Sequence, residues 1–324
     1  MNRTILFKTF LLVTCMGCTG NLPENNGNAL QLSAVSVDEG SISKGGTGTV
    51  TSIDNVCVYV AKDDYKPYDE TAPSLVFTNK AGNWTSDKAV IMQNGVNAKV
   101  YGAFPADAGI TNDNGNLKVD VEVLKGGDNT LDFLGSQQSD YLYSAEVSAS
   151  YSARTISLTM KHAMAKVSFR IVKGADVSET LLLKQVKILS NTNLLQAGSG
   201  YMLLNTTTGA ATLNGLASTS QITMDSGSSN RTELQINQSS PNVTCLVAPM
   251  STSESVLSFS ITVAKEGDTL ERTFTTSSIS PAVKWEAGFH YTYRITVNKM
   301  SGDVDGVLIE DWQNDASQNT SVGI

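Results

Sequence analysis

Histidine is nearly absent from this 324-residue sequence, which contains only His162 and His290. Neither histidine stands at a metal-ligand spacing from a second histidine or a cysteine, so the sequence predicts no metal site. A Gly-x-Ser-x-Gly nucleophile motif is also missing, and the glycine-rich residues 44–48 are not followed by a helix that could bind phosphate. We therefore predict no catalytic residues, no metal and no cofactor, and hence a protein that is not an enzyme.

Basic residues are scarce as well. The chain has 23 Lys and Arg against 31 Asp and Glu, a formal net charge of −8, and no arginine between Arg3 and Arg154. Binding to nucleic acid or to anionic lipid needs clustered Lys and Arg, so this composition argues against both as partners.

No hydrophobic run reaches the roughly 18 residues that a membrane-spanning helix needs. The apolar residues 10–16 form only a short run, and they follow a basic start at Arg3 and Lys8. This pattern is typical of a bacterial secretory signal, which we assign to residues 1–17. The alternative for these residues is a buried N-terminal helix of a protein that is not exported.

The end of this leader predicts a lipoprotein. Gly17 offers a small residue for cleavage before Cys18, and the polar residues 18–28 have the composition of a flexible tether. We therefore predict Cys18 as the lipidated N-terminus of the mature protein. Cys15 is the alternative lipidation site, although the bulky Thr14 precedes it. A secretory signal without lipidation is the alternative to a lipoprotein.

Two cysteines remain beyond the leader. Cys57 and Cys245 lie far apart in the sequence, in what we predict to be separate domains. We expect two small buried apolar residues. An exported protein could also be oxidised, so the sequence leaves their redox state open.

Helical periodicity is scarce, and apolar residues alternate with polar ones along most of the chain. Residues 257–263 and 291–297 alternate strictly, and turn residues 265–268 predict a hairpin after the first of them. Asn114-Gly115 predicts another tight turn. Only residues 179–187 could form a short helix, and their neighbours favour a strand. Many short strands with Gly, Asn and Ser turns indicate an all-β protein built of β-sandwiches.

The apolar face switches within residues 156–172, which predicts one long strand passing between two sheets through a bulge. We place the domain boundary just before it, giving an N-terminal domain at 29–153 and a C-terminal domain at 154–324. His162 is in phase with apolar neighbours, so we expect a buried structural residue on the strand that opens the second sandwich. His290 follows Gly288 at a strand start, which predicts a solvated turn histidine.

Several segments together resemble the fimbrillin family, the lipoprotein-derived type V pilins of Gram-negative anaerobes. Their order and spacing carry the resemblance through nearly the whole mature chain: VYGAFPADAG at 100–109, DYLYSA at 140–145, LTMKHAMAKVSFRI at 158–171, LKQVKI at 183–188, WEAGFHYTYRITVNK at 285–299 and VLIEDW at 307–312.

The resemblance implies two tandem transthyretin-like Greek-key β-sandwiches and a surface-exposed lipoprotein of the outer membrane. It also implies a mechanism of assembly into a fimbrium. A protease cuts polymerising subunits after a basic residue, usually arginine, in the loop after the first strand. Loss of that strand opens a groove, and a donor strand of a neighbouring pilus subunit fills it by β-augmentation.

Residues 29–37 are the expected removable first strand. Leu30, Leu32 and Ala34 share one face of an ideal strand, whereas Val35 and Val37 share the other. This phase slip predicts a bulge or a strand covered on both sides. Four or five buried apolar side chains would contribute on the order of 6–15 kcal/mol.

The expected cleavable loop, residues 39–49, departs from the family pattern. Lys44 is its only basic residue, so a cut by the family's mechanism would fall after Lys44 and leave Gly45 as the new N-terminus. Without that cut, the protein would keep its lipid as an anchor or accessory subunit. A tip subunit is a further possibility.

A different class of function is a monomeric surface lipoprotein that binds a host glycan or protein with its sandwich loops. Trp84 or Trp285 could then stack on a sugar, although the pattern favours a core or rim position for each.

Overall fold

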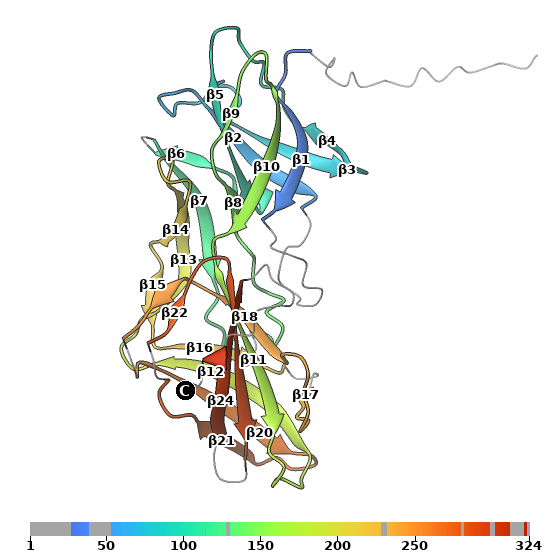
Figure 1. The fold of residues 1–324 in the computed structure, drawn as a ribbon, viewed down its shortest axis with the longest axis vertical. Helices are drawn as coiled ribbons and strands as arrows, with labels where there is room; N and C mark the ends of the chain where they lie inside the picture. Colours follow the sequence, from blue (N-terminus) through green and yellow to red (C-terminus); the bar gives the residue numbers. More distant parts are fainter. Residues whose placement is uncertain are drawn as a thin grey trace, which may run out of the picture.

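The computed structural model describes residues 27–38, 53–113, 115–127, 130–227, 232–253, 255–279 and 282–298, together with the backbone of 302–311 and 321–322. These residues form β-strands and one short 3₁₀ helix, η1 (Ala106–Ala108), so the all-β prediction is confirmed. The molecule is elongated, with the N-terminal strands at one end and most of the C-terminal strands at the other (Figure 1).

The N-terminal end is dominated by one eight-stranded sheet. Its order is β1 (Gln31–Val37), β10 (Thr155–His162), β8 (Leu142–Ser144), β5 (Ala98–Phe104), β2 (Asn55–Ala61), β3 (Ser74–Lys80) and β4 (Asn83–Ser86), and β9 (Val147–Ala149) also pairs with β5.

The central strands β2 and β5 of this sheet are buried on both faces. On one face Val56, Val58 and Val60 join a core with β1, β3 and β10. The sheet curls around this core, because Ala29 next to β1 pairs with Ile91 beyond β4. On the other face Tyr59 belongs to a second core, which a separate sheet covers.

The covering sheet lies beside β2 and β5 in the middle of the molecule (Figure 1). Its order is β14 (Ala211–Asn214), β13 (Leu195–Leu204), β7 (Asn116–Val123) and β6 (Thr111–Asp113), and β15 (Ala217–Thr219) pairs with β13.

The C-terminal end is a sandwich of two five-stranded sheets around the largest core. One sheet runs β18 (Val243–Val247), β11 (Ala165–Lys173), β23 (Phe289–Val297), β24 (Gly302–Asp311) and β25 (Ser321–Val322). The other sheet has the order β16 (Gln221–Asp225), β12 (Leu181–Ser190), β20 (Leu257–Lys265) and β21 (Glu271–Thr275), and β17 (Thr232–Glu233) also pairs with β12. A separate two-stranded ribbon pairs β19 (Met250–Ser251) with β22 (Lys284–Trp285).

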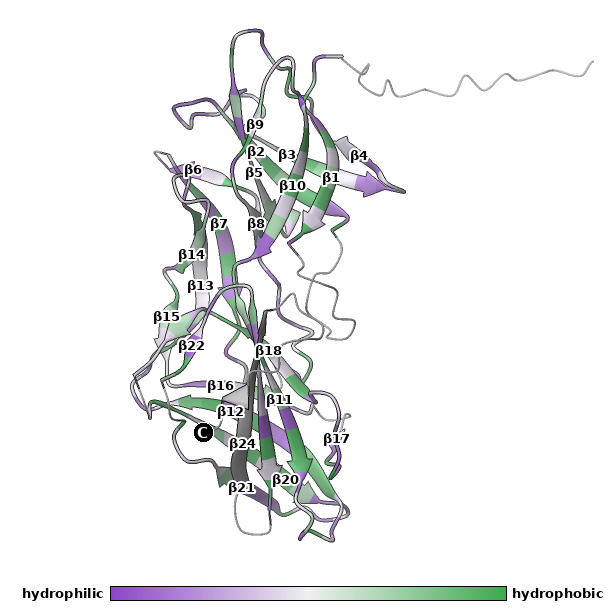
Figure 2. Ribbon diagram, in the orientation of Figure 1, coloured by the Kyte–Doolittle hydropathy of each residue, from purple (hydrophilic) through white to green (hydrophobic). Residues whose placement is uncertain are grey.

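The sandwich core explains the period of two in the sequence. Apolar and polar residues alternate along β11, visible as alternating green and purple (Figure 2). The inward side chains Phe169, Phe259 and Tyr293 meet in the centre, with ring centroids 4.8, 4.7 and 5.9 Å apart. Such offset and edge-to-face contacts add to the apolar burial.

The two predicted hairpins are confirmed. β6 and β7 pair with Asp113 opposite Asn116, and β20 and β21 flank the turn at residues 265–268. A short helix was the alternative for residues 179–187, but most of them belong to the strand β12 (Leu181–Ser190).

The prediction of one long strand over residues 156–172 is wrong. Two strands replace it, β10 and β11, which lie in different sheets and are separated by Ala163 and Met164. The division near residue 153 does not follow the sheets either, because β10 and β13 both pack with the N-terminal cores. We propose the boundary of the two domains at Ala163-Met164, with residues 196–219 returning to the N-terminal one.

Candidate functional site: the edge strand β1

β1 is the first strand of the chain and lies at the edge of the eight-stranded sheet. It runs parallel to β10, from Gln31 beside Thr155 to Val37 beside Met160. This confirms the prediction that residues 29–37 pair into the N-terminal sheet. Just before β1, Leu30 N–H donates to the Val90 carbonyl at 2.9 Å.

A β-bulge between Leu32 and Ala34 accounts for the phase slip in the sequence. The extra residue, Ser33, donates its hydroxyl to the Ile156 carbonyl at 2.8 Å. A shift of one residue moves every following side chain to the opposite face of a strand. Because of the bulge, Val35 and Val37 therefore follow Leu32 onto the core face.

The core contact of β1 is smaller than the sequence predicted. Leu30 and Leu32 are fully buried, but Val35 and Val37 are half-buried and Ala34 is exposed. Two buried leucines contribute on the order of 3–6 kcal/mol at 1.5–3 kcal/mol each, instead of the 6–15 kcal/mol expected for four or five residues. β1 is therefore a modestly held edge strand.

The residues predicted for processing lie outside the described part of the chain. These are the lipidated Cys18 with the leader 1–17, and the cleavage site Lys44-Gly45 in the loop at 39–49. All of them stay predictions.

His162 is buried, as predicted, but it ends β10 of the N-terminal sheet and does not lie on the strand that opens the second sandwich. Its Nδ1 lies 2.9 Å from an Asp140 carboxylate oxygen, and both side chains are almost completely enclosed. Asp140 begins the DYLYSA segment of the family resemblance, but no period in the sequence predicts its contact with His162. Lys166 on β11 interacts with the same carboxylate, and burial lowers the pKa of its ammonium.

The prediction of a solvated turn histidine at 290 is wrong. His290 lies within β23 beside Lys166 of β11, half-buried, with its Nε2 2.8 Å from the Ser168 hydroxyl. Burial lowers its pKa to about 3, and the positive charge of Lys166 acts in the same direction. The imidazole is therefore neutral at physiological pH.

Cys57 and Cys245 are buried, as predicted, and both are free thiols, which answers the question of their redox state that the sequence left open. Burial raises the pKa of Cys57 to about 11 and that of Cys245 to about 12, so neither is a thiolate near neutral pH. Trp285 is also buried and donates its indole N–H to the Tyr293 hydroxyl at 3.0 Å, which removes it as a sugar-stacking surface. Trp84 on β4 is half-buried.

The described residues contain neither a candidate metal cluster nor a candidate membrane-spanning helix. Their His, Cys, Asp and Glu side chains do not gather in groups of three or more that could hold a metal ion. Within the same residues, no helix has the length and apolarity to cross a membrane.

Comparisons with known proteins agree with this fold. The sequence model of the fimbrillin-like family matches residues 44–312. A fimbrial protein of Bacteroides vulgatus superposes with a TM-score of 0.57 at 11% identity, covering 88% of this chain and 100% of its own. Candidate cell-adhesion proteins of Bacteroides uniformis and Bacteroides ovatus superpose with TM-scores of 0.56 and 0.57 at 16% and 15% identity, covering 88% and 89% of this chain and 99% of each of theirs.

No curated protein matches the sequence. The structural likenesses, all at low identity, support the fold, and the sequence model spans most of the chain. The chain therefore belongs to the fimbrillin-like family.

Proposed function

We propose that this protein is a fimbrial subunit that is exported as a lipoprotein and joins its neighbours by strand exchange after β1 is removed. It has a structural and adhesive role and catalyses no reaction. Membership of the fimbrillin-like family supports a fimbrial role at the cell surface, with other pilus subunits as partners. Lipid on Cys18 would place the precursor on the outer membrane.

The observation that carries the proposal is the position of β1. It is an edge strand with one partner, β10, along Gln31–Val37, and only Leu30 and Leu32 are fully buried in the core. Without β1, β10 would present a row of unpaired backbone groups, and its Ile156 and Leu158 would lose their apolar cover. An extended strand from another subunit satisfies both needs.

The cut that frees β1 must fall between β1 and β2. Lys44 is the only Lys or Arg between Val37 and Asn55, and two glycines follow it. A protease binds its substrate in an extended form, which a glycine-rich loop adopts at little cost. We therefore assign cleavage to the Lys44–Gly45 bond.

Limited digestion with a lysine-specific protease tests this assignment. We expect the first cut after Lys44, followed by strand-exchanged oligomers that resist dilution. The Lys44→Gln variant, with the same protease, should remain monomeric. Mass spectrometry of the product identifies the new N-terminus as Gly45.

A cut protein that stays a monomer and does not bind a donor-strand peptide would refute polymerisation. An uncut anchor or accessory subunit that keeps its lipid would then be the better account. Recovery of the natural surface protein with a lipidated Cys18 and an intact Lys44–Gly45 bond would give the same answer.

A further inference from the structure

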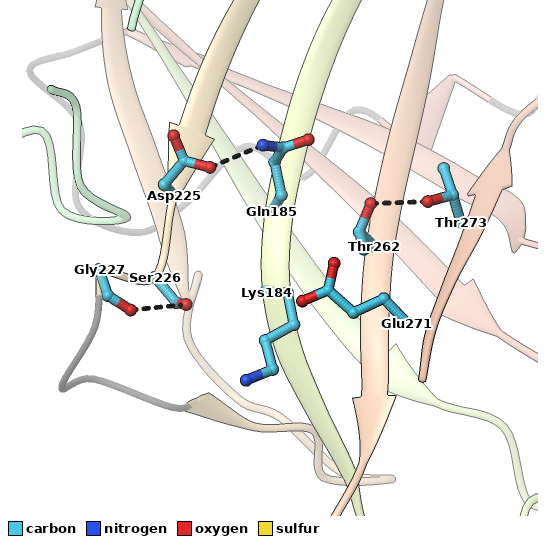
Figure 3. Close-up of a pocket in the computed structure, with 8 residues that line it drawn as sticks. All are labelled: Lys184, Gln185, Asp225, Ser226, Gly227, Thr262, Glu271 and Thr273. Carbon is cyan, nitrogen blue, oxygen red and sulfur yellow. Dashed lines mark hydrogen bonds between the residues drawn. The ribbon is translucent and has the colours of Figure 1, made fainter. Parts of the chain in front are cut away.

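The outer face of the sheet β16-β12-β20-β21 carries a cavity that strand exchange does not use. Its volume is about 470 Å³, within the range of small-molecule sites. One row of side chains crosses all four strands in register: Asp225, Gln185, Thr262 and Thr273 (Figure 3). Their strand neighbours Met224, Val186, Ile261 and Phe274 face the sandwich core instead.

A β-bulge adds a second row to this face. The bulge between Leu183 and Gln185 places two consecutive residues, Lys184 and Gln185, on the outside, so that Leu183 and Val186 both reach the core. An ordinary strand would turn Lys184 inward. Bulges re-aim side chains in this way near functional sites. Glu271 lines the cavity on the side of β21 (Figure 3).

The polar groups of the first row are held in fixed positions. Gln185 Nε2 donates to the Asp225 carboxylate at 2.7 Å, and the hydroxyls of Thr262 and Thr273 are 2.9 Å apart. Asp225 and Thr262 are each 8% exposed. Figure 3 shows the amide oxygen of Gln185 on the side away from Asp225, turned toward the Thr262 strand. Carboxylate, amide and hydroxyl groups thus form one row across the four strands of the sheet.

The chemistry of the lining limits the ligand. Among the described residues, no aromatic or large aliphatic side chain lines the cavity, so a ligand must be bound there mainly through hydrogen bonds. Carboxylates only accept, an ammonium only donates, and hydroxyls and amides do both. A ligand made of hydroxyl groups, each both a donor and an acceptor, matches all of these partners.

The charges of the lining residues limit the chemical class of the ligand further. Two carboxylates, Asp225 and Glu271, and one ammonium, Lys184, line the cavity, and within the described residues neither Lys184 nor Glu271 has an ion-pair partner. Together these groups give the lining a net charge of −1, which disfavours an anion, and Lys184 offsets one of the two carboxylates that a cation would need. We propose that this cavity binds a neutral saccharide through Lys184, Gln185, Asp225 and Glu271.

This site would give the protein an adhesive contact that does not depend on assembly. The experiment therefore uses the uncut full chain as a monomer, so its result does not depend on whether strand exchange occurs. The probes are free galactose, glucose, mannose, fucose and N-acetylglucosamine. Saturation-transfer NMR detects binding, and calorimetric titration gives the dissociation constant.

We expect at least one of these sugars to bind saturably. The variants Glu271→Gln and Gln185→Ala should weaken that binding at least tenfold. Glu122→Gln, an exposed carboxylate on β7, is the matched control and should bind as the parent does. Thermal unfolding of all three variants checks that the fold is intact.

Three results would overturn the proposal: no sugar of the panel binds, or both cavity variants bind with the parent's affinity, or inorganic phosphate or lysine methyl ester binds in the cavity more tightly than any sugar. The last outcome would assign the cavity to a charged ligand, such as a side chain of a partner protein.

Discussion

His290 lies in surroundings that change its acid–base chemistry. It lies between Lys166 on β11 and Thr292 on its own strand, and its Nε2 is within hydrogen-bond distance of the hydroxyls of Ser168 and Thr292. Burial and the charge of Lys166 both favour the neutral ring, and its pKa is lowered from 6.5 to about 3. The folded protein therefore resists protonation that the unfolded chain accepts.

This difference predicts a dependence of stability on pH. Below pH 6.5 the unfolded chain binds a proton at His290 that the folded chain does not, so stability falls as the pH falls from 6.5 toward 3. The slope from this one group is at most about 1.4 kcal/mol per pH unit. His290→Gln should flatten the profile in this window, measured by urea unfolding. An unchanged slope in the variant would contradict the assignment.

At the scale of the element, an engineered disulfide can fix β1 to its neighbour β10. Ser36 and Thr159 are neighbours in the parallel pair β1–β10, and both are exposed on the face away from the core. Neighbouring strands are about 4.8 Å apart, within reach of a disulfide. In the double variant Ser36→Cys/Thr159→Cys, oxidation should block oligomer formation after the cut at Lys44, and reduction should restore it. Ser36→Cys alone is the control. Oligomers that form as well under oxidation would show that β1 need not leave.

A second element, the segment between β7 and β8, ties the two ends of the molecule together. Thr223 N–H on β16 donates to the Lys125 carbonyl at 2.7 Å, and Leu131 lies in the sandwich core. Gly126 makes this approach possible, since it has φ +67° and a Cβ there would overlap the Thr223 carbonyl oxygen.

Gly126→Ala should therefore destabilise the protein by about 1–3 kcal/mol, through strain and a displaced segment. Gly127→Ala is the matched control, because Gly127 also has a positive φ but nothing lies within 4 Å of its added Cβ. Urea unfolding midpoints of the two variants measure the difference. Equal midpoints would mean that the close contact with Thr223 has no role.

The same elements show how far the sequence predicts the structure. Alternation in residues 257–263 and 291–297 predicts β20 and β23, because a period of two reports directly which face is buried. It does not report the partner strand. The face switch near Ala163 is visible in the sequence, whereas the pairing of β10 with β1, more than 100 residues away, is not.

Sites that depend on distant partners were missed for the same reason. His290 follows a glycine that suggests a turn, but its burial comes from Lys166 and Ser168 on another strand. The cavity on β12 could not be predicted either, because a single bulge at Lys184 decides which residues face outward. The bulge in β1, in contrast, is predicted by the sequence, because the apolar residues change face between Leu32 and Val35.

At the scale of the whole molecule, proteolytic cleavage after Lys44 and release of the protein from the membrane are two separate steps, because β1 lies between the proposed lipid and the proposed cleavage site. The proposed lipid on Cys18 precedes β1, and the proposed cut after Lys44 follows it. Within the described residues, the cut therefore leaves the body of the protein attached to its anchor through β1 and the residues just before it. These contacts are the ladder with β10, the pairing of Ala29 with Ile91, and the burial of Leu30 and Leu32 with partial burial of Val35 and Val37.

The largest apolar part of these contacts, the two buried leucines, contributes on the order of 3–6 kcal/mol, which lies near or below the lower end of the roughly 5–15 kcal/mol by which a domain is stable. We therefore expect the cut protein to remain on membranes in buffer, and to leave them on addition of a donor-strand peptide or at urea concentrations too low to unfold it. Sedimentation of membranes followed by immunoblotting measures this. Cys18→Ala should never be retained, whereas oxidised Ser36→Cys/Thr159→Cys should stay bound until it is reduced. Release by the cut alone would mean that β1 does not hold the body, and that donor strands find the site already empty.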